Sequence, residues 1–246
     1  MKTLLFCCLA ISSAFSIASG AEENDAFAKA NQEYAAGNFR DAIASYESLL
    51  KAGEFSAAVF YDLGNAHFRA GDSGKAILNY ERALALEPHH PEAEANLRLV
   101  RDKARALELK RSPTERITLQ GTATQYTVAA AIAFWIVLFS LAGIFFSRRR
   151  SPALVGALIL SLFVAGCAGF GLYSVESGSE GRDLAIVVAK GTEARLATAD
   201  SSGTVLALPP GSEVKILSTR GDWVYASLPN DLLGWIPAQS AERVRL

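Results

Sequence analysis

Two long stretches without a charged residue dominate the pattern of hydrophobic and polar positions along the chain. They cover residues 126–147 and 152–173 and consist mostly of aliphatic, aromatic and small residues. Each is long enough to cross the hydrocarbon core of a bilayer as an α-helix. Only a short connection with three arginines, at 148–150, separates them. The pattern therefore predicts a hairpin of two transmembrane helices.

Residues 1–21 form a third apolar stretch, which is too short for a comfortable membrane span. Lys2 precedes an apolar core at 4–17, and small residues follow at 18–21. This order predicts a secretory signal peptide, with an uncleaved anchor as the alternative. In both cases the chain that follows is exported.

The orientation of the hairpin depends on opposing signals. The arginines at 148–150 favour the cytoplasmic side, whereas Lys110, Arg111 and Arg116 lie near the other end of the first span. The export signal decides between them, and it predicts that both non-membrane parts face the periplasm at a bacterial inner membrane. A lipoprotein-like Val-Ala-Gly-Cys sequence ends at Cys167. Because it is internal, we interpret it as part of a second span rich in small residues.

Residues 22–111 carry an internal repeat with a period of 34 residues. The matching positions are Asn31 and Asn65, Gly37 and Gly71, Ala42-Ile43 and Ala76-Ile77, Tyr46-Glu47 and Tyr80-Glu81, and Leu50 and Leu84. The period and the residue types match those of the tetratricopeptide repeat, a pair of antiparallel helices. The first copy is weaker, because it has Ala30 where the second has Gly64. We predict two repeats that stack to bury their apolar faces.

One more helix is expected from Pro91 to about Arg111. Its apolar residues form one continuous stripe: Ala93, Leu97, Val100, Ala104 and Leu107. Such a stripe predicts a helix that caps the repeat stack, with a dimerising coiled-coil helix as the alternative. A linker is expected over residues 112–125.

The first helices of such repeats line a concave surface, on which Asn31 and Asn65 occupy equivalent positions. Both are candidate peptide-binding residues, because their amides can hydrogen-bond a peptide backbone or a terminal carboxylate. Bonding within the helix stack is the alternative. Phe27 and Asp62 stand nearby in place of lysine or arginine, so we do not expect a clamp for a C-terminal carboxylate.

Residues 182–246 change to a β-type pattern. Strands are predicted at 185–188, 213–217 and 223–228, where β-branched and aromatic residues concentrate between turns rich in glycine and proline. Short strands at this spacing predict a small barrel. Val214 and Ile216 alternate along one strand and are expected in its core.

Three glycine motifs follow one another in this region: Gly211, then Gly221-Asp222-Trp223, then Gly234-Trp235-Ile236-Pro237. Their order resembles that of a bacterial SH3 domain. Trp223 and Trp235 are too large to be buried fully in so small a barrel, so both are candidate peptide-binding residues. Closure of the barrel edge is the alternative role for these two side chains.

Composition removes several functional classes. The net charge of −1 has no signature of nucleic-acid binding. The three cysteines, Cys7, Cys8 and Cys167, all lie in apolar runs, and the three histidines lack companions at metal-binding spacing. The sequence also has no phosphate loop and no nucleophile elbow. We therefore expect a protein without catalytic residues, cofactor or metal.

The predicted fold class is multi-domain: an all-α tetratricopeptide-repeat solenoid, a two-helix transmembrane hairpin and an all-β SH3-like barrel. This order resembles the BatE-type proteins of the Bacteroides aerotolerance operons. The motifs that carry the resemblance are Leu63-Gly64-Asn65-Ala66, Gly71-Asp72, Lys75-Ala76-Ile77, Tyr80-Glu81-Arg82-Ala83-Leu84, Pro88 and Asn96-Leu97.

The resemblance implies partners of two kinds, von Willebrand factor A-type membrane proteins and a MoxR-type ATPase, and a role in aerotolerance or envelope stress. It brings no catalytic residues. The leading hypothesis is a scaffold that binds protein partners through its repeats and its SH3-like domain. The alternatives are a peptidoglycan-binding module and a targeting or regulatory subunit for a cell-wall hydrolase.

Overall fold

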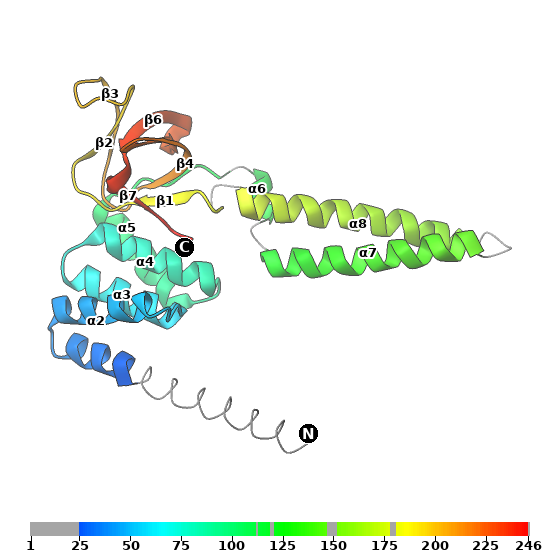
Figure 1. The fold of residues 1–246 in the computed structure, drawn as a ribbon, viewed down its shortest axis with the longest axis horizontal. Helices are drawn as coiled ribbons and strands as arrows, with labels where there is room; N and C mark the ends of the chain where they lie inside the picture. Colours follow the sequence, from blue (N-terminus) through cyan, green and yellow to red (C-terminus); the bar gives the residue numbers. More distant parts are fainter. Residues whose placement is uncertain (1–24, 112, 119–120, 147–151, 178–180, 246) are drawn as a thin grey trace, which may run out of the picture. The chain divides into compact units, whose positions relative to one another are not determined.

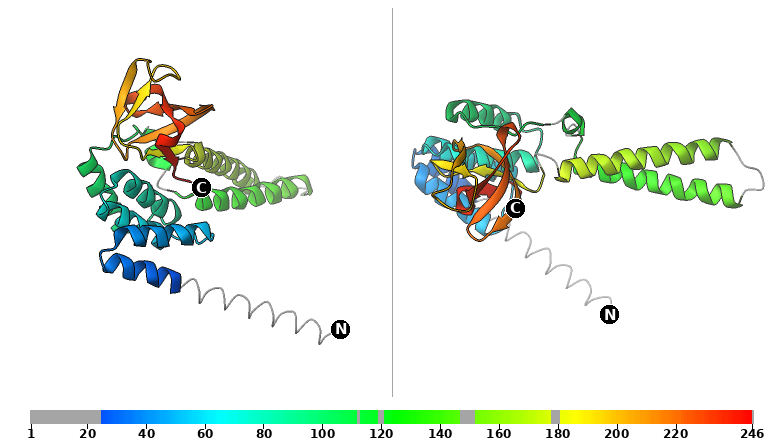
Figure 2. Two further views of the ribbon diagram at one scale, coloured as in Figure 1. Left: turned by 60° about the vertical axis from the view of Figure 1, so that its left-hand side comes forward. Right: turned by 90° about the horizontal axis from the view of Figure 1, so that it is seen from above.

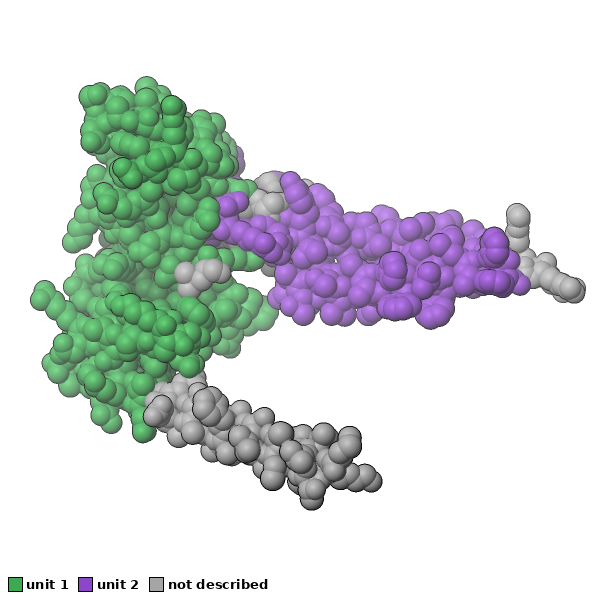
Figure 3. Space-filling model, viewed as in Figure 1, with its two compact units in different colours: residues 1–108, 185–246 green, residues 109–184 purple. Residues whose placement is uncertain are grey.

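A computed structural model describes residues 25–111, 113–118, 121–146, 152–177 and 181–245. The expected signal peptide and the arginines at 148–150 lie outside these residues. The chain divides into two compact units (Figure 3): one joins the residues up to 108 with residues 185–246, and the other covers residues 109–184. The first unit therefore combines segments that precede and follow the expected hairpin.

Antiparallel helices make up the N-terminal half of the first unit (Figure 1). A helix with its described part at 25–35 is followed by α2 (Phe39–Lys51), α3 (Ala57–Arg69), α4 (Ser73–Leu86) and α5 (Pro91–Ala104). Gly37 and Gly71 end the first helix of each pair with φ of +81° and +85°, values that favour glycine. Ser56 and Asp72 begin α3 and α4 as N-caps, each accepting a backbone N–H bond.

The repeated positions of the sequence form the core of this helical region. Ala42 and Ala76 are fully buried, and so are Tyr46 and Tyr80. Gly64 lies directly under Tyr80, since a Cβ there would come within 2.8 Å of the tyrosine ring. The spacing of 34 residues thus predicts which side chains pack between the helices.

The helix α5 is shorter than the helix predicted from Pro91 to about Arg111. It ends at Ala104, where Arg105 adopts a left-handed φ of 52°. Beyond it, the Leu107 N–H donates to Ser212 Oγ (3.1 Å) and the Glu213 N–H donates to the Leu107 carbonyl (2.8 Å). These bonds to the β domain replace the helical ones, so the expectation of a helix to about residue 111 was wrong.

The second unit is a helix hairpin. Its elements are α6 (Pro113–Thr118), α7 (Ala123–Phe146) and α8 (Pro152–Ser177), and α7 and α8 run antiparallel along each other (Figure 2). Both long helices are apolar enough to cross a membrane, and large side chains such as Trp135 and Phe163 are exposed on them. An exposed apolar surface of this kind is consistent with two membrane spans. The segment expected as a linker contains α6.

Polar contacts join α6, α7 and α8 at one end of the hairpin. The Tyr126 hydroxyl donates to the Thr118 carbonyl (2.9 Å), and Thr118 Oγ1 lies 2.7 Å from Ser174 Oγ. Gly171 makes room for Tyr126, because a Cβ at that position would come within 2.6 Å of the ring. Close packing at a small residue of α8, as the sequence indicated, is therefore seen at Gly171, whereas a Cβ at Gly166 or Gly169 would meet nothing within 4 Å.

The C-terminal domain is an antiparallel sheet that curls on itself (Figure 2). Its strands are β1 (Leu184–Val187), β2 (Thr192–Arg195), β3 (Thr204–Leu208), β4 (Glu213–Arg220), β5 (Trp223–Leu228), β6 (Leu232–Pro237) and β7 (Ala241–Arg243), in the order β3-β2-β6-β5-β4-β1-β7. The three predicted strands correspond to β1, β4 and β5. Val214 is fully buried in the core, and Ile216 packs against it partly buried.

Candidate functional site

An asparagine and a tyrosine pair across the helices of each repeat. Tyr46 of α2 donates its hydroxyl proton to Asn31 Oδ1 (2.5 Å), and Tyr80 of α4 donates to Asn65 Oδ1 (2.8 Å). The two bonds are related by the 34-residue period. Each second helix thus orients the amide of its first helix, and the carbonyl oxygens of both predicted site residues are engaged within the stack.

Asn96 of α5 extends this pattern. Its Nδ2 donates to Asn65 Oδ1 (3.0 Å) and to the Tyr61 hydroxyl (3.3 Å). We call the six residues Asn31, Tyr46, Tyr61, Asn65, Tyr80 and Asn96 the amide–tyrosine row. Sequence reasoning did not single out Asn96 as a site residue, because it follows Asn65 by 31 positions rather than by the repeat period.

Burial alters the acid–base properties of the row. Desolvation raises the pKa of Tyr46 and of Tyr80 above the ordinary tyrosine value, and the negative charge of Asp62 adds to both shifts. Both hydroxyls therefore stay protonated donors. The Asp62 carboxylate lies next to the row, because Asn65 Nδ2 donates to its Oδ1 (3.5 Å).

Between residues 61 and 68, the partly exposed side chains of α3 form one face. They are Tyr61, Asp62, Asn65 and Phe68, while the intervening Leu63, Gly64, Ala66 and His67 are buried. The Tyr61 ring lies 4.9 Å from that of His90, between centroids, and Lys103 Nζ lies 4.9 Å from the Phe68 centroid. We call these four α3 residues the repeat face. The face combines two aromatic rings, one amide and one carboxylate. Peptide contact by Asn31 and Asn65 stays a prediction.

His67, behind this face, is a packing residue. Burial lowers its pKa to about 4, so the imidazole is neutral near pH 7. Within the described residues, no group of three histidine, cysteine, aspartate or glutamate side chains is placed to hold a metal ion.

The two predicted tryptophans lie on the outer face of the β sheet, away from the helical candidates. Trp223 and Trp235 alternate with the buried Val224 and Ile236 along β5 and β6, and both are partly exposed. Trp235 pairs across the strands with Tyr225, with ring centroids 5.0 Å apart. Strand alternation could have identified Tyr225 as well, because it lies two residues after Trp223.

A buried ion pair joins the helical region to the β domain. Arg101 of α5 is only 8% exposed and pairs with Glu81 of α4 (2.5 Å) and with Glu213, which is 3% exposed, at the start of β4. Arg82 adds bonds to Glu242 (3.4 Å) and to the Arg243 carbonyl (3.0 Å). We call the contact made by these six residues the interdomain clamp.

Close backbone packing accompanies the clamp. A Cβ at Gly74, near the start of α4, would come within 2.9 Å of the Val188 carbonyl oxygen. Gly211, with φ of +93°, lies against Ile77 and Ala106. Leu107 packs into the β-domain core. The helical region and the β domain are therefore one packed body.

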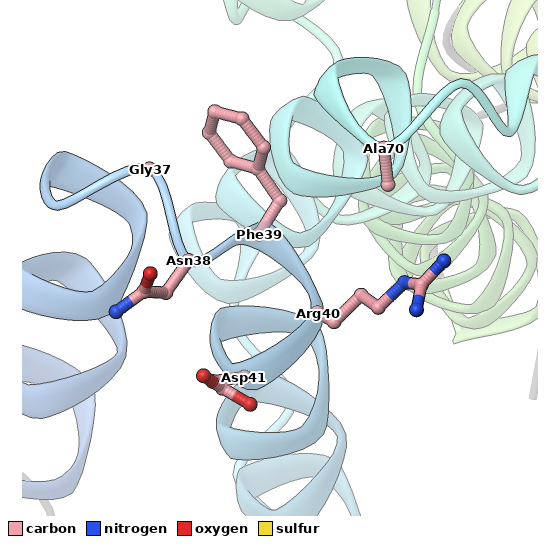
Figure 4. Close-up of a pocket in the computed structure, with 6 residues that line it drawn as sticks. All are labelled: Gly37, Asn38, Phe39, Arg40, Asp41 and Ala70. Carbon is pink, nitrogen blue, oxygen red and sulfur yellow. The ribbon is translucent and has the colours of Figure 1, made fainter.

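Two surface hollows lie within the described residues. One, of about 320 Å³, is lined by Gly37, Asn38, Phe39, Arg40, Asp41 and Ala70 (Figure 4), and there Arg40 and Asp41 point in different directions from the start of α2. The other, of about 720 Å³, lies on the hairpin and is apolar, with Tyr126, Phe163 and Phe170 among its lining residues.

Comparison with protein families identifies the helical region. The tetratricopeptide repeat family matches residues 27–91 and 61–109. A comparison with curated proteins found no match. The chain therefore has a tetratricopeptide-repeat region, followed by a hairpin of two long apolar helices and an all-β antiparallel domain. Repeats of this class suggest protein–protein interaction.

Proposed function

We propose that this protein is a non-catalytic, membrane-anchored adaptor that binds protein partners through its repeat region and its SH3-like β domain. The repeat face carries this proposal, because it presents aromatic, amide and carboxylate groups, and hydrogen bonds of the amide–tyrosine row orient its Asn65 and Tyr61. Orientation of this kind reduces the entropy lost when a ligand binds.

The interdomain clamp supports a location of both domains on one side of the membrane. Arg101 precedes the hairpin and Glu213 follows it, and the two side chains pair directly. A chain that crosses a bilayer twice returns to the side where it started, so the contact fits two spans. The expected export signal makes that side the periplasm of a bacterial inner membrane.

The resemblance to BatE-type proteins suggests which partners the adaptor binds. It suggests von Willebrand factor A-type membrane proteins and a MoxR-type ATPase system in an aerotolerance or envelope-stress complex. The adaptor would present two binding domains from one anchor, which raises the effective concentration of each toward a shared assembly.

The test is a partner census in cells. The tagged full chain is cross-linked, extracted from membranes, purified and analysed by mass spectrometry beside the double variant Tyr61→Ala/Phe68→Ala. Both rings belong to the repeat face and are partly exposed, so the fold should persist. A control, Phe55→Ala, removes an aromatic ring that is 53% exposed outside that face.

Loss of protein partners from the double variant alone supports the adaptor. An unchanged partner set with a correctly folded double variant contradicts a docking role for the repeat face.

The outer face of the β domain favours cell-wall binding as a second candidate. Trp223, Tyr225 and Trp235 offer adjacent aromatic surface, which can stack on sugar or peptide. Detergent-solubilised full chain would be sedimented with purified peptidoglycan beside Trp235→Ala and the same Phe55→Ala control. Sedimentation that depends on Trp235 supports this candidate, and co-purification of a hydrolase in the census would instead favour a targeting role.

A further inference from the structure

Asp62 is the carboxylate of the repeat face, and it differs in ion pairing from three other carboxylates of the helical region. Glu33 pairs with Lys29, Glu81 with Arg101, and Glu94 with Arg98. Asp62 forms no ion pair among the described residues. Asn65 Nδ2 donates a long hydrogen bond of 3.5 Å to Asp62 Oδ1.

The surroundings of Asp62 do not compensate its charge. Partial burial raises its pKa, and only the bond from Asn65 and the nearby His90 lower it. A carboxylate that is desolvated without a cation weakens the fold in its ionised form. Perturbed groups of this kind concentrate at functional sites.

Three hydrogen-bond donors of the amide–tyrosine row point to acceptors other than Asp62. The hydroxyl of Tyr80 and the Nδ2 of Asn96 both point to Asn65 Oδ1, and the hydroxyl of Tyr46 points to Asn31. The face thus offers a negative charge with few donors to satisfy it. A ligand that brings its own cationic donors complements this arrangement, whereas a carboxylate would meet repulsion.

We propose that the repeat face binds a protein segment carrying an arginine or lysine, whose cationic group pairs with Asp62 beside the ring of Tyr61. This inference rests on the proposed adaptor function and names the chemistry of its partner. The guanidinium or ammonium group satisfies the Asp62 carboxylate with charge-assisted hydrogen bonds, and the Tyr61 ring adds a cation–π contact. Asp62 is the specificity-determining residue of the face.

The test measures binding to the full chain in detergent micelles. Fluorescein-labelled peptide pools carry a fixed central arginine, lysine, glutamine or glutamate and are otherwise randomised, and binding is followed by fluorescence anisotropy. We expect the arginine and lysine pools to bind about tenfold or more tightly than the glutamine pool, a difference of about 1.4 kcal/mol. The glutamate pool should bind most weakly, and added salt should reduce the preference.

The decisive variant is Asp62→Asn, which keeps the shape of the side chain and removes its charge. It should abolish the preference for cationic pools, while Asp41→Asn, an exposed carboxylate on α2, should keep it. Equal binding of all four pools, or a preference that survives Asp62→Asn, overturns the inference.

Two results separate this inference from the adaptor proposal. If no pool binds but the partner census still depends on Tyr61 and Phe68, the cationic specificity fails and the adaptor stands. If the pools fail and the census is also unchanged by those substitutions, both proposals fail.

Discussion

The interdomain clamp and the repeat face differ in whether a buried or half-buried carboxylate has a cation beside it. At the clamp, Glu213 and Glu81 enclose Arg101, so the charges are compensated inside the chain. At the repeat face, Asp62 has no such cation, and its pKa is raised by burial. This difference distinguishes the clamp, which joins two regions of the chain, from the repeat face, which we propose as a binding surface.

Removing the cation of the clamp should have the largest effect on stability. In Arg101→Met, Glu81 and Glu213 lose the arginine that pairs with both of them, and we expect a loss of stability of about 3–5 kcal/mol, as for other broken buried ion pairs. Urea unfolding of the detergent-solubilised chain, followed by tryptophan fluorescence, measures this loss.

The triple variant Arg101→Met/Glu81→Leu/Glu213→Leu is the control for the clamp. It removes every charge of the buried group, so much of the stability should return. A single variant as stable as the wild type would show that the clamp contributes nothing.

His67 offers a pH-dependent comparison on the same helix as Asp62. Its folded-state pKa of about 4 lies below the ordinary value of 6.5, so the unfolded chain binds more protons between these two values. Stability should fall as pH drops from about 6.5 to 4, by on the order of 3 kcal/mol if the full shift holds. His67→Leu should lack this part of the pH dependence in urea unfolding measured at several pH values. Identical pH profiles for the two proteins would contradict the burial effect.

Neutralising Asp62 should strengthen the fold slightly. Because its folded-state pKa is raised, the ionised carboxylate weakens the native state at neutral pH, and this penalty disappears as pH falls toward the ordinary value of 3.8. Asp62→Asn should therefore be more stable than the wild type at pH 7, by at most about 1 kcal/mol because solvent screens a partly exposed charge. A clear loss of stability at pH 7 would mean that Asp62 has a compensating partner within the fold.

An exposed ion pair should give the smallest effect. Arg98 and Glu94 are spaced as i and i+4 on α5, and both side chains are mostly exposed. Arg98→Ala should change the free energy of unfolding by no more than about 0.5 kcal/mol. A loss as large as that of Arg101→Met would show that burial does not distinguish the two arginines.

Local patterns determined much of this protein. The repeat period predicted the helices of the repeat region and their core tyrosines. The length of the two uncharged stretches predicted the two long apolar helices. The alternation of residue types predicted strands of the β domain, with Val214 in its core. The location of Asp62 on the same helix face as Asn65 could also be predicted, because the two residues are three positions apart on one helix. These features follow from spacing along one element, where the periods of helix and strand set which side chains share a face.

Only the tertiary structure decided which parts of the chain meet. Arg101 and Glu213 lie 112 positions apart, and no local pattern relates them. The same holds for the end of α5, where Leu107 leaves the helical stripe because the β domain offers it a core and backbone partners. Nor could the sequence show that Glu81 would gain a cation while Asp62 would not, because compensation of a charge depends on groups that folding brings together from distant segments.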